Sequence, residues 1–210
     1  SSGKNPVSSF KLIESSAAYG VEYSAMLATI NRAISPKWVM ANTSNGGSET
    51  NLVVQQVPAT LEEFGIRAMA HNWQQFTDLA ATVEERQNLT DPAGYLVIDS
   101  WSAGGSPTSA RTQMATLAYY YLVGDSTSTM LMLWGGEEPA SSWSRHWFNA
   151  LTYNVGQAQG DFSLFATGTD PANLLLTYNI YQRKYDNALV LYKPLSYARG
   201  QTSGTTADST

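Results

Sequence analysis

The sequence predicts an α/β fold with about five parallel strands, alternating with helices, and a C-terminal β-hairpin. Three observations predict it. Short apolar runs, which are typical of buried parallel strands, recur along the chain. Segments with apolar residues three and four positions apart separate these runs, as crossover helices would. Near the carboxyl end, two β-rich runs flank a short turn, which indicates a hairpin.

The amino-terminal elements are a strand, a helix and a second strand. The first strand is expected at Phe10–Glu14. A helix follows, because apolar residues from Tyr19 to Ile34 are spaced three and four apart. Pro36 ends this helix, since the residue before a proline disfavours helical geometry. The second strand is expected at Lys37–Thr43, before the turn-forming residues 44–47.

A long helix is expected next, over residues from about 58 to 89. Its apolar residues lie on or near one face, and Thr60 would cap its amino terminus. Glu62 and Glu63 follow the cap directly, where acidic side chains complement the positive end of the helix dipole. The cap and the periodicity together predict that the whole segment is helical.

Two strands with a helix between them are expected in the middle of the chain. Tyr95–Trp101 and Thr129–Trp134 are nearly unbroken apolar runs that end in tryptophan. The helix between them would open at Pro107 and close at Gly124. A further helix is expected after Pro139, which can occupy a first helical position.

The last elements are a fifth strand and a hairpin. Phe162–Ala166 is the fifth strand of the expected parallel sheet. The hairpin would pair Leu174–Arg183 with Ala188–Lys193 around the turn at residues 184–187.

The composition excludes several classes of protein and of partner. The chain has 210 residues, is 43% hydrophobic and only 14% charged, which indicates a folded globular domain. Its net charge of -5 argues against a nucleic-acid partner. With no cysteine and two histidines, neither a metal site nor a cofactor is expected. No apolar run approaches the ~18 residues of a membrane span.

The ends of the chain differ in composition from its middle. We expect residues 1–9 to form an N-terminal extension and residues 10–197 a single α/β domain. Residues 198–210 are rich in Gly, Ser and Thr, which predicts a flexible tail or linker. Such linkers often join secreted modules, so a secreted protein is expected, although no signal peptide is visible.

The order of these segments resembles the C-terminal half of a (β/α)8-barrel glycoside hydrolase. The resemblance covers about residues 10 to 197 and is carried by four segments: Leu96–Trp101, Ser109–Tyr121, Leu131–Glu138 and Tyr181–Pro194. It implies a partial or truncated (β/α)8-type barrel, because a full barrel has eight strands. It also implies a bacterial enzyme that hydrolyses a β-linked polysaccharide or oligosaccharide by carboxylate acid/base chemistry.

Four carboxylates are the catalytic candidates, because each lies at or just beyond the end of an expected strand: Glu14, Asp99, Glu137 and Glu138. The carboxyl ends of parallel strands share one rim, and glycoside hydrolysis needs two carboxyl groups across one bond. The resemblance would put Glu14 after the fourth barrel strand and Glu137 and Glu138 after the seventh. Structural roles compete with this interpretation: Glu137 and Glu138 as helix-dipole partners, Asp99 as a loop cap and Glu14 as a solvated residue.

Four further residues are candidates for substrate binding: Asn42, Trp101, Trp134 and His146. Tryptophans at strand ends can stack on sugar rings, and an amide can hydrogen-bond a hydroxyl. Asn42 could equally form a turn, and His146 could lie on a helix surface.

A second class of function stays open at this point. A half barrel that lacks part of its rim could be a non-catalytic carbohydrate-binding or scaffold protein. An open parallel sheet also leaves an edge that must be covered. The hairpin or a second copy of the chain could cover it, so a homodimer is expected.

Overall fold

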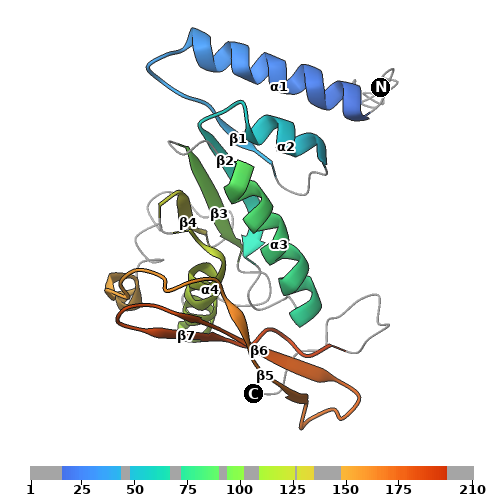
Figure 1. Cartoon of the computed structure of the whole chain (residues 1–210), viewed down its shortest axis with the longest axis vertical. Coiled ribbons are helices and arrows are strands. Elements are labelled where there is room, and N and C mark those ends of the chain that lie inside the picture. The colour runs from blue at the N-terminus through green and yellow to red at the C-terminus, as the bar shows by residue number, and fades with distance from the viewer. Residues whose placement is uncertain are drawn as a thin grey trace, which may run out of the picture.

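The chain forms two β-sheets with helices between them (Figure 1). The computed structural model describes residues 16–43, 48–66, 72–89, 94–101, 109–125, 127–134 and 148–197. The helices are α1 (Ser16–Ala33), α2 (Ser48–Val54), α3 (Trp73–Leu89), α4 (Ala110–Val123) and the short 3-10 helix η3 (Asn149–Thr152). The strands are β1 (Met40–Asn42), β2 (Ala59–Ile66), β3 (Tyr95–Trp101), β4 (Thr129–Trp134), β5 (Ser163–Thr169), β6 (Thr177–Lys184) and β7 (Leu189–Tyr192).

The first sheet is parallel, with the strand order β1-β2-β3-β4. A helix connects each strand to the next, so the predicted α/β fold with repeated βα units is confirmed. The four strands form an open sheet, and no barrel is seen in the part of the chain that the structure describes. The strand expected at Phe10–Glu14, and the helix expected after Pro139 as far as residue 147, lie outside the described residues.

One face of the parallel sheet is covered by helices. Leu96 and Ile98 of β3 are fully buried, and they pack with Phe76 and Val83 of α3 and Leu122 of α4. Towards the β1 edge, the same face packs on α2 in a smaller cluster: Leu27, Ala41, Val53 and Val57. Sequential strands joined by right-handed crossovers place all their helices on one face, which explains this arrangement.

The second sheet is antiparallel, with the order β5-β6-β7, and it packs against the other side of α3 and α4. Phe76 lies between the layers, with ring centroids 4.7 Å from Tyr181 and 5.4 Å from Tyr192. The predicted hairpin is confirmed as β6 and β7. The fifth parallel strand is wrong: β5 pairs antiparallel with β6, because only a short loop separates the two strands and a parallel pair needs a long crossover.

The helix expected from about residue 58 to 89 is wrong in its first third. Residues 59–66 are β2, and Thr60 is a buried strand residue rather than a helix cap. Burial overrides the local helix signals, because Glu62 lies on the covered face and forms an ion pair with Arg86 of α3. Helix α3 instead begins with a capping box, in which the Gln75 backbone amide donates to Asn72 Oδ1 and the Asn72 backbone amide donates to Gln75 Oε1, both at 3.0 Å.

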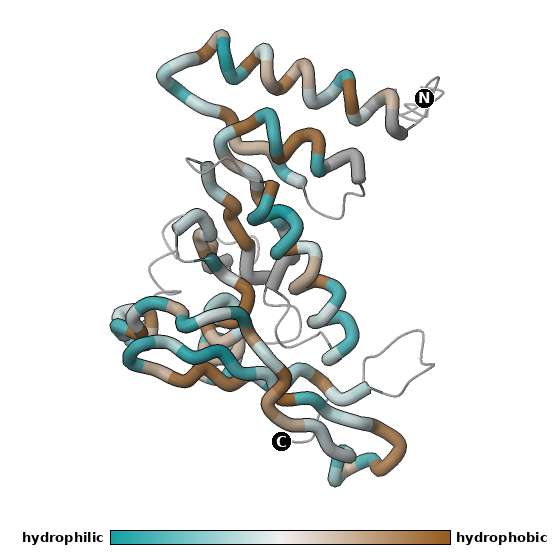
Figure 2. Tube along the Cα trace, in the orientation of Figure 1, coloured by the Kyte–Doolittle hydropathy of each residue, from teal (hydrophilic) through white to brown (hydrophobic). Residues whose placement is uncertain are grey.

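The carboxyl-terminal segment fastens the antiparallel sheet to the start of α3. The Trp73 amide donates to the Leu195 carbonyl at 3.0 Å, and the Trp73 indole donates to the Thr177 carbonyl at 3.0 Å. The Trp73 ring also meets Tyr197 edge to face. These contacts tie residues far apart in the sequence into one body. Figure 2 shows hydrophobic residues along both β3 and the antiparallel sheet.

Candidate functional site

The sequence candidates divide into those that the structure describes and those that it does not. Glu14, Glu137, Glu138 and His146 lie outside the described residues. Asp99, Trp101 and Trp134 lie in described strands, but their side chains are not described. Asn42 is described fully and is exposed.

Three strands of the parallel sheet end at candidate residues. β1 ends at Asn42, β3 at Trp101 and β4 at Trp134. Trp101 and Trp134 are direct Cα partners across the pair β3–β4. The carboxyl ends of parallel strands meet at one edge, which is where sites form in α/β folds. The two tryptophan positions are therefore neighbours at the edge where chemistry is expected.

Asn42 lies nearer to the amino end of the parallel sheet than the tryptophan pair. It pairs with Leu61, which pairs with Val97, four positions before Trp101. At about 3.3 Å per residue, this offset is roughly 13 Å along the strand direction. Asn42 is therefore separated from the two tryptophan positions along the strand direction.

A bulge in β2 lies beside Asp99. Glu62 pairs with Ile98 and Ile66 pairs with Ser100, so three residues of β2 face the single residue Asp99. Bulges of this kind bend a strand and re-aim side chains, and they recur beside active sites. Gly65 is the sequence signal for it, because a glycine inside a strand often marks a bulge.

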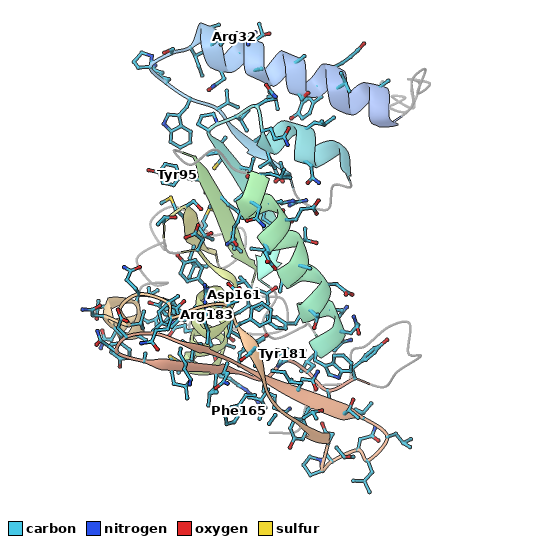
Figure 3. The ribbon with its side chains drawn as sticks, in the orientation of Figure 1. Arg32, Tyr95, Asp161, Phe165, Tyr181 and Arg183 are labelled. Carbon is cyan, nitrogen blue, oxygen red and sulfur yellow. The ribbon has the colours of Figure 1, made fainter. Side chains whose placement is uncertain are left out.

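The second face of the parallel sheet is open in the part of the chain that the structure describes. Met40, Tyr95 and Met130 are 47%, 42% and 51% exposed, and Val97 is half-buried between them. Figure 3 shows Tyr95 on the side of β3 away from α3. Parallel sheets are normally covered on both faces. This open face, defined here by Met40, Tyr95, Val97 and Met130, leads to the edge that carries the tryptophans.

The covered face holds a buried ion pair that the sequence did not reveal. Glu62 and Arg86 are 4% and 2% exposed and contact each other. Burial lowers the pKa of the Arg86 guanidinium, while the Glu62 carboxylate beside it stabilises its charge. The pair joins β2 to α3 at the point where the bulge in β2 begins.

At the amino end of the parallel sheet, the antiparallel sheet holds the carboxyl end of α4 by hydrogen bonds. Arg183 of β6 donates through Nη1 to the carbonyl oxygens of Tyr121, Leu122 and Gly124, and through Nε to that of Gly160. Tyr185 donates a further hydrogen bond to the Tyr121 carbonyl. These donors satisfy the free carbonyls at the end of α4, where a cation also complements the helix dipole.

The described residues contain neither a metal-binding cluster nor a membrane-spanning helix. Among the described residues, no three His, Cys, Asp or Glu side chains are grouped so that they could hold a metal ion. None of the described helices combines the length and the apolar character needed to cross a membrane.

Comparisons with protein-family models, with curated proteins and with solved structures found no match to this chain.

Proposed function

We propose that this chain is a glycoside hydrolase that cleaves a β-linked polysaccharide or oligosaccharide at the carboxyl edge of its parallel sheet. The pairing of Trp101 with Trp134 carries the proposal. Strands on one face of a sheet are about 4.8 Å apart, so two indoles from these positions would form one aromatic platform. Such a platform suits the apolar face of a sugar ring.

The acid/base chemistry would come from carboxylates next to this platform. Successive strand positions alternate between faces, so position 99 belongs with Val97 to the open face. Glu137 and Glu138 follow Trp134 by three and four residues, and Glu14 precedes α1. One carboxyl group would act as the acid and a second as the nucleophile or base. A separation of about 5 Å would predict retention, and about 6.5–9.5 Å inversion.

The order of the parallel strands supports a barrel-type winding. Strands β1 to β4 follow one another in sequence order, each connection passes over the same face, and the other face is open and apolar. A barrel has this organisation, with its inner face turned away from the helices. The partial (β/α)8-type barrel therefore stays part of the proposal.

Turnover and binding can be separated in one experiment. We would measure reducing-sugar release from a panel of β-linked polysaccharides and run affinity electrophoresis on the same panel. A hydrolase releases sugar from at least one member. Retarded migration without any release would reject the hydrolase and leave the binding function.

The open face supports that second candidate, a non-catalytic carbohydrate-binding or scaffold protein. Tyr95 is exposed among apolar residues on a sheet, and such a surface can bind saccharide without any catalytic carboxylate. The same face is the basis for a linked proposal, that a second copy covers the open sheet. Secretion is proposed separately, from the linker-like composition of residues 198–210. Light scattering tests the dimer, since a monomer mass would contradict it.

A further inference from the structure

A cleft of about 390 Å³ lies at the amino end of the parallel sheet, opposite to its carboxyl edge. It lies between the last turns of α3 and α4 and the segment that leads into β5. Figure 3 shows Asp161 and Arg183 close to each other here, from this segment and from β6. Its volume falls in the range of roughly 300–1,000 Å³ that is typical of small-molecule sites.

The back of this cleft is fixed by hydrogen bonds. Arg183 donates from Nε and Nη1 to four carbonyl oxygens, which holds its guanidinium group in place. Gln87 donates to the Val123 carbonyl at 2.9 Å and to the Thr129 hydroxyl at 2.7 Å. Partial burial raises the pKa of Asp125, but hydrogen bonds from Thr127 and Ser128 outweigh it and leave the pKa below its usual value.

The mouth of the cleft carries polar side chains that have no hydrogen-bond partner among the described residues. Glu84 and Asn88 of α3 and Asp161 of the opposite wall are exposed, and within the described part of the chain they make no hydrogen bond or ion pair. Carboxylates only accept hydrogen bonds at neutral pH, whereas the amide both donates and accepts. A matching ligand must bring several donors and at least one acceptor.

An aromatic ring forms part of the cleft wall. Phe162 is half-buried, and its centroid lies 5.6 Å from Phe76 and 5.9 Å from Tyr181, so the core fixes its position. Leu122 and Ala80 line the cleft beside it. A matching ligand therefore also has an apolar face.

We propose that this cleft is a second saccharide site, in which Phe162 contacts the apolar face of a pyranose ring and Glu84, Asp161 and Asn88 bind its hydroxyl groups. A pyranose has hydroxyl groups that donate and accept around its rim and C–H groups across its face, which matches both walls. The site is separate from the carboxyl edge, and it does not depend on hydrolase activity.

The test is an NMR titration with thiocellobiose, a disaccharide whose sulfur linkage resists hydrolysis. We expect amide shifts in residues 84–88 and 158–162. Asp161→Ala should weaken this binding by about tenfold, the factor expected when one hydrogen bond to a charged group is lost. Asn88→Ala should weaken it by a smaller factor, since its amide is neutral. Glu22→Gln, which removes an exposed acid on α1, should leave it unchanged.

Two further probes separate sugar recognition from simple charge attraction. Spermidine has ammonium groups but no ring, and sorbitol has hydroxyl groups but no fixed ring face. Thiocellobiose should shift the cleft residues more than either. Equal or larger shifts with spermidine, no shifts with thiocellobiose, or full binding by Asp161→Ala with an unchanged melting temperature would each overturn the proposal. Shifts confined to the ends of β3 and β4 would overturn it while leaving the proposed hydrolase site intact.

Discussion

The two faces of the parallel sheet differ in how completely they are covered. The helix face buries Leu96 and Ile98 completely and holds the ion pair of Glu62 and Arg86. The open face exposes Met40, Tyr95 and Met130 by about half. Both faces belong to the same strands, so strand formation alone does not explain the difference. The covered face forms part of the hydrophobic core, whereas the second face stays exposed in the part of the chain that the structure describes.

The largest expected effect concerns the ion pair on the covered face. Arg86→Met leaves the buried Glu62 carboxylate without its cation and should lower the free energy of unfolding by about 3–5 kcal/mol. The double variant Glu62→Leu/Arg86→Met should regain most of this loss, because well-packed apolar residues can replace such a pair. Urea denaturation measures both, and equal losses in the single and double variants would show that the pair is not coupled.

The second effect concerns the joint between α4 and the antiparallel sheet. Arg183→Met removes four hydrogen bonds from a charged donor and should lower the free energy of unfolding by about 3 kcal/mol. Arg183→Lys should lie in between, since an ammonium group cannot reproduce the fork of the guanidinium group. If both variants melt like the wild type, the joint is not a source of stability.

A smaller effect of opposite sign is expected within the aromatic core. The Tyr119 hydroxyl is fully buried and has no hydrogen-bond partner in the described part of the structure, so Tyr119→Phe should stabilise the fold by about 1 kcal/mol. Tyr120→Phe is the matched control. It removes a hydroxyl that donates to the Thr129 carbonyl at 2.8 Å, and it should destabilise by a similar amount. Calorimetry that gives both changes the same sign would contradict this account.

The smallest change in stability is expected on the open face. Met130→Glu should alter the free energy of unfolding of the monomer by less than about 0.5 kcal/mol, since half of the side chain is already in water. If a second copy covers this face, the same variant should halve the mass measured by light scattering. Leu189→Glu, on the antiparallel sheet, should not change that mass. A stable dimer of Met130→Glu would place the dimer contact elsewhere.

The sequence predicted some elements well and others poorly, for physical reasons. Tyr95–Trp101 and Thr129–Trp134 were predicted with their observed bounds, because buried parallel strands are apolar without interruption. β2 was mistaken for the start of a helix, because Thr60 and Glu62 have the local chemistry of a helix cap. Only the distant Arg86 gives Glu62 a reason to lie in a strand.

Long-range partners explain what remained hidden at the candidate sites. The nearness of Trp101 and Trp134 could be predicted, because strand ends of a parallel sheet share an edge. The role of Arg183 could not, since its partners at the end of α4 are 59 to 62 residues away in the chain. The same holds for the cleft, whose walls meet only after the antiparallel sheet packs on the helices.

We propose that carboxylates at the carboxyl edge of the parallel sheet cleave a β-linked saccharide. The most direct measurement compares reducing-sugar release by the wild type with that of Asp99→Asn, Glu14→Gln, Glu137→Gln and Glu138→Gln, with melting temperatures recorded in parallel. The account predicts that at least one variant loses activity by a factor of 100 or more, on the order of a general acid–base contribution, while its fold is unchanged. Full activity in all four variants would contradict it.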